Sequence, residues 1–285
     1  MEPAVQVFWV PKLGNSEEEY EDASAFSVPK RRFAVADGAT ESSFSDRWAQ
    51  SLVRRYAADP PLTPPTSVSL PEWVAPLQHE WHAGIPWDKL PWFAEEKARS
   101  GAYASLLGVC FAEPERLPPR FRFWSWFRRP KPQAAGFRWY ALAIGDTCLF
   151  HVRNGQLLKA FPLESAAAFS DRPLLLSSNP ARNQSVWSAV QLAEGECHLG
   201  DAFFLATDAL GKWFLERFEA KERPWETLAA LRTQTEFVAW VDNARQDRSL
   251  KNDDTTLVRF VWQAAAPQPT AADPAAPVQP NRQGN

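Results

Sequence analysis

The sequence predicts one domain of the α+β class, and three observations support this prediction. Apolar runs typical of strands alternate along the chain with segments that repeat apolar residues at helical spacing. The connections between strands are of the antiparallel kind, because a Gly145-Asp146 turn separates two apolar runs and Asn154-Gly155 is a strong hairpin signal. No repeat of fixed period occurs. Elements of this kind pack together in layers around one core.

The first half of the chain is expected to supply most of the strands. Apolar or β-branched runs predict strands at 5–10, 23–28, 32–36, 103–111, 139–144 and 148–153. A helix is expected over 44–58, where Ser42 or Ser43 can cap its first turn. The proline-rich segment 59–77 is expected to be an extended, polyproline-like connector that ends this helix.

The second half is expected to add three helices between two further strands. The strands are predicted at 202–207 and 255–262, and the helices at 210–219, 225–232 and 235–248. The last helix places Phe237, Val238, Val241 and Ala244 on one face. Helices therefore flank an antiparallel core.

Residues 1–263 are expected to form the domain, with insertions at about 59–95 and 114–138. Residues 264–285 contain seven Ala and five Pro, which predicts a disordered tail. The first insertion carries Trp73, Trp81, Trp87 and Trp92. We favour packing of these aromatic residues onto the core, and a peptide-docking surface is the alternative.

The second insertion contains a basic and aromatic arm, residues 116–138, with seven Lys or Arg and no acid. The favoured interpretation is a hairpin extension whose aromatic rings cover the body while the arginines stay in solvent. Docking of acidic partner proteins is the next alternative. An anionic membrane surface is a further one, and nucleic acid is the least favoured partner.

Composition excludes several classes of protein. A hydrophobic content of 45% is enough for a large core, so disorder of the whole chain is excluded. Three Cys are too few for a disulfide scaffold, which favours the cytoplasm. The longest apolar stretch is about half of the roughly 20 residues that a membrane-spanning helix needs, and no signal peptide is recognisable. We expect a soluble, unprocessed protein.

Carboxylates stand where predicted strands begin or end: Asp37, Asp208 and the pair Asp253-Asp254. Several carboxylates that converge on one spot repel one another unless a cation lies between them. Oxygen ligands without a Cys or His cluster favour Mg²⁺ or Mn²⁺ over Zn²⁺. The alternative is that each Asp caps its own turn or the following helix.

Six short motifs in order make the chain resemble the metal-dependent protein phosphatases of the 2C type (PP2C), over about residues 7–261. They are Glu21-Asp22-Ala23, Ala36-Asp37-Gly38, Ser100-Gly101, Gly145-Asp146-Thr147, Thr207-Asp208-Ala209 and Asp253-Asp254-Thr255-Thr256. The resemblance implies a sandwich of two antiparallel β-sheets flanked by α-helices, with two Mn²⁺ or Mg²⁺ ions at one end.

The resemblance also implies roles for individual residues. Asp37 would bridge both ions, Asp208 and Asp253 would hold one, and Glu21 with the Gly38 carbonyl would hold the other. A hydroxide between the ions would attack the phosphate monoester of a phosphoserine or phosphothreonine protein. The implied protein is a Ser/Thr phosphoprotein phosphatase that acts opposite a cognate Ser/Thr kinase.

The chain departs from the family at several positions, and these motivate an alternative. Residues 15–20 read NSEEEY where the family has an Arg for the substrate phosphate. Ala209 replaces a Gly, which costs little unless the backbone needs a positive φ. Ala98 and Lys212 stand where some members hold a third ion, and Ala39 where some have a His. The alternative is a catalytically weak or inactive relative that binds phosphoproteins or scaffolds an assembly.

Overall fold

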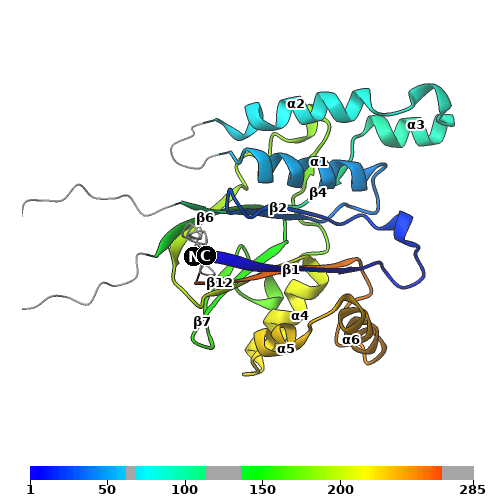
Figure 1. The fold of residues 1–285 in the computed structure, drawn as a ribbon. Coiled ribbons are helices and arrows are strands. Elements are labelled where there is room, and N and C mark those ends of the chain that lie inside the picture. Colours follow the sequence, from blue (N-terminus) through cyan, green and yellow to red (C-terminus); the bar gives the residue numbers. More distant parts are fainter. Residues whose placement is uncertain (62–67, 113–135, 265–285) are drawn as a thin grey trace, which may run out of the picture.

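The computed structural model describes residues 1–61, 68–112 and 136–264 (Figure 1). It contains two five-stranded antiparallel sheets, with strand orders β1-β12-β11-β7-β8 and β10-β6-β5-β3-β2, and a short pair, β4-β9. The strands are β1 (Glu2–Val10), β2 (Ala23–Ser27), β3 (Arg32–Ala36), β4 (Tyr103–Ala104), β5 (Leu106–Ala112), β6 (Phe137–Ile144), β7 (Cys148–Arg153), β8 (Gln156–Phe161), β9 (Leu176–Ser177), β10 (Gln191–Cys197), β11 (Ala202–Ala206) and β12 (Thr255–Gln263).

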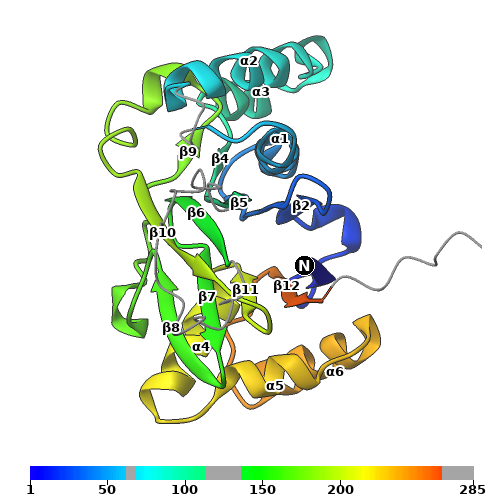
Figure 2. The ribbon, with the colours of Figure 1, turned by 60° about the vertical axis from the view of Figure 1, so that its left-hand side comes forward.

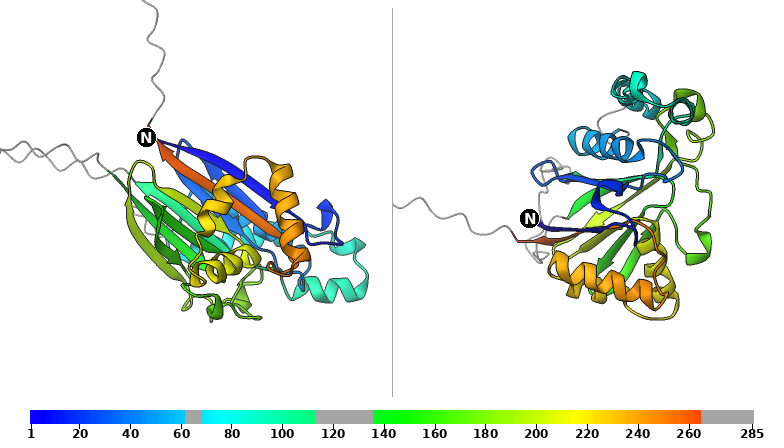
Figure 3. Two further views of the ribbon diagram at one scale, coloured as in Figure 1. Left: turned by 90° about the horizontal axis from the view of Figure 1, so that it is seen from below. Right: turned by 90° about the vertical axis from the view of Figure 1, so that its right-hand side faces the viewer.

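Helices cover the outer faces of both sheets (Figures 2 and 3). They are α1 (Ser45–Ala58), α2 (Leu70–Ala83), α3 (Trp92–Arg99), α4 (Asp208–Glu219), α5 (Pro224–Ala230) and α6 (Gln234–Gln246). The helix α1 lies directly on the sheet that contains β2 and β3, and α2 lies on α1, while α4 to α6 cover the other sheet. The predicted α+β class and the sandwich flanked by helices are therefore confirmed.

An aromatic core holds the two sheets together. Phe33 from one sheet stacks on Phe260 from the other with ring centroids 3.9 Å apart, and Phe203 lies beside Phe260 at 5.3 Å. All three side chains are fully buried. Burial of such rings contributes strongly to stability, so the two sheets are fixed relative to each other.

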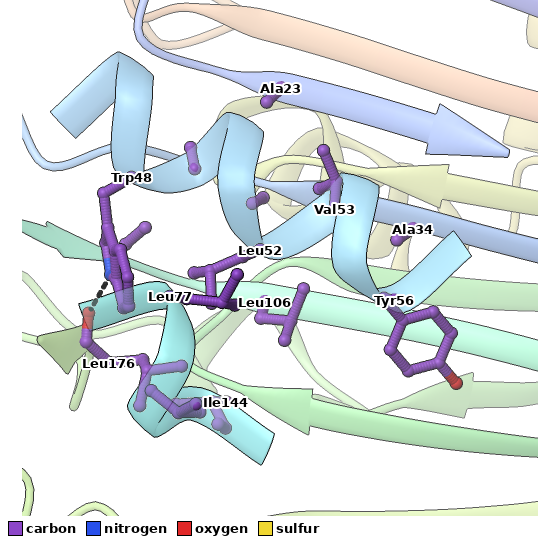
Figure 4. Packing of buried hydrophobic residues seen from close by; sticks show 14 of the residues in the cluster. Ala23, Ala34, Trp48, Leu52, Val53, Tyr56, Leu77, Leu106, Ile144 and Leu176 are labelled. Carbon is purple, nitrogen blue, oxygen red and sulfur yellow. Dashed lines mark hydrogen bonds between the residues drawn. The ribbon is translucent and has the colours of Figure 1, made fainter. Parts of the chain in front are cut away.

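The inner face of α1 explains why this segment is a helix. Trp48, Leu52 and Tyr56 follow one another at four-residue spacing and are all buried (Figure 4). The Trp48 indole Nε1–H donates to the Leu176 carbonyl at 2.8 Å, which satisfies the one polar atom of that ring. The helix is thereby joined to β9 as well as to the sheet.

The prediction of an extended connector over 59–77 is wrong for its second part, where α2 begins at Leu70. Ser69 and Glu72 form a capping box, and a Pro lies in the first turn, where its missing N–H costs nothing. The stripe that contains Trp73, Leu77 and Trp81 is buried in the apolar cluster to which the inner face of α1 also belongs. This burial outweighs the roughly 3 kcal/mol cost of a proline inside the helix.

The Trp-rich insertion packs onto the body, as favoured from the sequence. Trp73 and Trp81 are buried, whereas Trp92 on α3 is 77% exposed. The predictions for most of the basic arm 116–138 and for most of the tail 264–285 concern residues outside the described ranges. In the described ranges, every helix is too short or too polar to span a lipid bilayer.

The register of the strands brings several distant segments to one end of the sandwich. Ala23 at the start of β2 pairs with Ala36 at the end of β3. Ala206 at the end of β11 pairs with Leu257 near the start of β12 and with Cys148 at the start of β7. The loops that carry the acidic motifs therefore leave the sheets at one end.

Candidate metal centre

Five aspartates gather at that end, and we call them the acidic cluster: Asp22, Asp37, Asp146, Asp208 and Asp253. Burial raises the pKa of Asp37 well above its usual range, and the charges of the other four raise it further. The structure therefore brings the three predicted catalytic residues, Asp37, Asp208 and Asp253, into one electrostatic environment.

The loop of Asp37 is held from both sides by Ser105. The Asp37 backbone N–H donates to Ser105 Oγ at 3.1 Å, and the Ser105 N–H donates to the Asp37 carbonyl at 2.9 Å. The Ser105 hydroxyl also contacts the hydroxyl of Thr147, beside Asp146. Ser105 interrupts the predicted strand 103–111, which the structure divides into β4 and β5. The interruption fixes the position of Asp37.

Asp22 is a member of the cluster that sequence reasoning missed. It is buried, and its Oδ2 accepts a hydrogen bond from the Thr256 hydroxyl at 2.6 Å. Burial raises the pKa of Asp22 well above its usual range, and the charge of Asp254 adds to the effect. Its Oδ1 has no hydrogen-bond partner among the described residues. A buried oxygen of this kind is costly unless a donor or a cation pairs with it.

The other predicted pair, Glu21 and Gly38, lies beside the cluster. The Ser45 hydroxyl at the start of α1 donates to Glu21 Oε1, and burial raises the pKa of Glu21. A Cβ atom on Gly38 would lie 2.7 Å from the Glu21 carbonyl oxygen. Only glycine therefore lets these two loops approach so closely.

Asp254 holds the loop in front of β12 in place. Its Oδ1 accepts from the Lys12 backbone N–H and its Oδ2 from the Glu21 backbone N–H, both at 2.7 Å. On the other side, Arg245 of α6 donates to the Asp253 carbonyl at 2.6 Å. Both carboxyl oxygens of Asp254 are thus used for structure.

A lysine that sequence reasoning did not single out touches two members of the cluster. Lys251 Nζ lies 2.9 Å from Asp208 Oδ2 and 2.7 Å from Asp253 Oδ2. These two carboxylates raise the pKa of Lys251 against the opposing effect of burial. No local pattern predicts this contact, because Asp208 is distant in sequence.

The substitution of Ala209 for glycine is accommodated. Ala209 lies in the first turn of α4, where the backbone is helical, and its N–H donates to Asp208 Oδ1 at 2.6 Å. A methyl group at this φ carries no strain. Lys212, one turn further along, lines a cavity of about 420 Å³ together with Lys251 and Arg248.

The donor chemistry fits a hard divalent ion. All five members of the cluster offer carboxylate oxygens, and Asp22 Oδ1 is buried without a partner among the described residues. However, no three His, Cys, Asp or Glu side chains of the described ranges are arranged as a ready chelate. Binding of an ion would therefore require side-chain adjustment at the cluster.

The metal-free protein is expected to lose stability as the pH rises from about 5.5 to about 8. Burial, together with the charge of Asp208, raises the pKa of Asp146 to about 7. Its unfolded value is about 3.9, so the folded state binds an additional proton between these values, and stability falls with rising pH. The Asp146 carboxyl lowers the free energy of unfolding by at most about 4 kcal/mol.

Urea unfolding at about pH 5.5 and about pH 8, in the presence of a chelator, measures the slope of the free energy of unfolding against pH. Asp146→Asn should reduce the slope, whereas Asp171→Asn, a change at an exposed position, should leave it unchanged. Stability that rises over this interval would contradict the electrostatic description of the cluster.

Comparison with known proteins shows the fold. No protein-family model and no curated protein matches the sequence. The structure resembles the Mycobacterium tuberculosis serine/threonine phosphatase PstP/Ppp with a TM-score of 0.59 and 14% identity, over 93% of this chain and 100% of that chain. The serine/threonine phosphatase Stp1 from Staphylococcus aureus matches with a TM-score of 0.55 and 10% identity, over 91% and 95%.

A third match is the catalytic domain of the serine/threonine protein phosphatase PstP in complex with two manganese ions, with a TM-score of 0.52 and 14% identity, over 91% of this chain and 98% of that chain. The chain therefore has a PP2C-like fold, as the resemblance of its motifs implied.

Proposed function

We propose that the chain is a metal-dependent Ser/Thr phosphoprotein phosphatase that hydrolyses phosphate monoesters. The observation that carries this proposal is the acidic cluster, which five separate loops bring to one end of a PP2C-like sandwich. The proposal is also supported by similar structures, because proteins of the same fold are serine/threonine phosphatases, one of them in complex with manganese.

The proposed ligands of two Mn²⁺ or Mg²⁺ ions are Asp37, Asp208, Asp253, Glu21 and the Gly38 carbonyl. When bound, such ions polarise the phosphate and activate water for attack. The contribution of the chain is to hold the backbone of these residues in place. Ser105 holds Asp37, and Arg245 holds Asp253 through its carbonyl.

The cysteines offer no competing mechanism. Cys110, Cys148 and Cys197 are all buried and free. Burial raises the pKa of the Cys110 thiol to about 11, and it raises the pKa values of the other two thiols further. A thiol that stays protonated at neutral pH is a poor nucleophile. This supports hydrolysis without a covalent enzyme intermediate.

The proposed substrates are phosphoserine and phosphothreonine proteins, with a cognate Ser/Thr kinase or its substrates as partners. We retain the cytoplasm as the proposed location. The basic arm 116–138 remains a candidate for protein docking, and nucleic acid remains the least favoured partner.

Hydrolysis of a phosphothreonine peptide and of p-nitrophenyl phosphate tests the proposal. After treatment with a chelator, the protein should turn over both compounds only when Mn²⁺ or Mg²⁺ is added. Asp208→Asn should lose this activity, and Asp171→Asn, at an exposed position, should keep it. No metal-dependent turnover above that of Asp208→Asn would refute the proposal.

A second candidate function is phosphoprotein binding or scaffolding by a weak or inactive relative. The observation in its favour is that the Lys251 ammonium already pairs with Asp208 and Asp253. A scaffold would bind its phosphoprotein normally with Asp37, Asp208 and Asp253 all changed to Asn. Calorimetry with a phosphopeptide separates it from an enzyme that needs metal to bind the substrate.

A further inference from the structure

The ion pairs of Lys251 occupy the two carboxylates that the proposed metal site needs. Lys251 lies in the loop between α6 and β12, and its Nζ is within 3 Å of one oxygen of Asp208 and one of Asp253. Asp208 opens α4, so the lysine joins two different elements. An ammonium group has three donors, and two of them are used here.

The same two oxygens cannot be shared freely between an ammonium and a divalent ion. Asp208 Oδ1 and Asp253 Oδ1 already accept backbone N–H groups, so a divalent ion at these two residues would compete with the ammonium for the Oδ2 atoms. The two positive charges would also repel each other at short range. In the metal-free protein the lysine offsets part of the repulsion among the aspartates. Binding of an ion between Asp208 and Asp253 therefore requires that Nζ moves away.

The surroundings of Lys251 allow such a movement. Its side chain is 57% exposed. It borders the cavity of about 420 Å³ that Lys212, Trp213 and Arg248 also line. A four-carbon stem can rotate into this space without disturbing the buried core, because only the ammonium is anchored.

We propose that Lys251 is an intramolecular competitor of the divalent ion at Asp208 and Asp253. It offsets part of the charge of these two carboxylates in the metal-free protein and is displaced into the neighbouring cavity when the ion binds. The proposal rests on the proposed metal-dependent function, and it adds that the Lys251 ammonium sets the metal concentration at which the site is filled.

Calorimetric titration of the chelator-treated protein with Mn²⁺ tests it without measuring activity. Lys251→Met keeps the length of the side chain and removes its charge. This variant should bind Mn²⁺ roughly tenfold more tightly than the unchanged protein, as expected when two ion pairs no longer compete. Its metal-free melting temperature should fall, because the aspartates then lack their counter-ion.

Two further variants separate competition from other effects. Lys212→Met removes a charge from the same cavity, where Lys212 forms no described ion pair with the cluster, and should change the affinity much less. Lys251→Arg keeps the charge and should retain the weaker binding of the unchanged protein. A merely structural role of Lys251 would lower the melting temperature without raising the affinity.

The outcomes distinguish this inference from the proposed function. If the unchanged protein binds Mn²⁺ and Lys251→Met binds it no more tightly, the inference is wrong and the phosphatase proposal stands. If only Lys251→Met binds Mn²⁺, the inference is supported, and the unchanged protein fits the inactive alternative. If neither binds Mn²⁺, both proposals are overturned.

Discussion

Asp37→Asn is expected to abolish metal-dependent hydrolysis and, at the same time, to raise the melting temperature of the metal-free protein. Burial and four neighbouring carboxylates raise the pKa of Asp37 well above its usual range, so the ionised side chain opposes folding at neutral pH. Asn has nearly the same shape and no charge. The melting temperature should rise by about 5 °C, and turnover should fall at least about a hundredfold.

Thermal unfolding with chelator and with Mn²⁺ measures both consequences. The unchanged protein should gain stability with Mn²⁺, since an ion that binds only the folded state shifts the equilibrium toward it. Asp37→Asn should lose most of this gain, while Asp171→Asn should behave like the unchanged protein. A lower metal-free melting temperature for Asp37→Asn would show that the Asp37 carboxylate stabilises the fold and would contradict repulsion within the acidic cluster.

Asp37 is expected to lower stability and to be needed for activity. A residue of this kind is conspicuous in the sequence, which explains why the sequence located this end of the molecule. A carboxylate directly after the buried strand β3 is unfavourable for folding, so Asp37 stood out as a local conflict between composition and structure. The same argument identified Asp208 and Asp253. It did not identify Asp22 or Asp146 as site residues, although both stand in motifs that resemble those of the family.

The elements that the sequence missed are those with a weak hydrophobic signal. The edge strands β8 and β10 are largely exposed or half-buried, so they lack the continuous apolar run of the central strands. The helix α2 was misassigned because its prolines favour an extended chain locally. Its buried stripe of apolar residues depends on contact with α1, which no local pattern reports.

The contact of Lys251 illustrates the same limit for the site. The sequence contains the lysine two positions before Asp253, where a solvent-exposed side chain is the ordinary expectation. Only the pairing of β11 with β12 brings Asp208 within reach of its ammonium. Sequence reasoning could therefore predict the residue types of the cluster but not how their charges are balanced.

Asp201, outside the acidic cluster, should be a residue whose loss strongly reduces stability. It is completely buried in front of β11 and accepts hydrogen bonds from His151, from Arg153 and from the His198 backbone N–H. Burial alone would raise the pKa of Asp201, but the hydrogen bonds from Arg153 and His151 hold it well below its usual range. Its charge is thus fully compensated in the folded state.

Asp201→Ala is expected to lower the free energy of unfolding by about 3–5 kcal/mol, because it leaves Arg153 and buried His151 without their acceptor. Glu194→Ala, which breaks the exposed pair with Arg138, should cost at most about 1 kcal/mol. Urea unfolding at neutral pH measures both. A low folded pKa contributes stability above the unfolded value, so the effect of Asp201→Ala should shrink as the pH falls below about 4. If Asp201→Ala lost no more free energy of unfolding than Glu194→Ala, water would replace the Asp201 carboxylate in this network. The charge of Asp201 would then have no structural role.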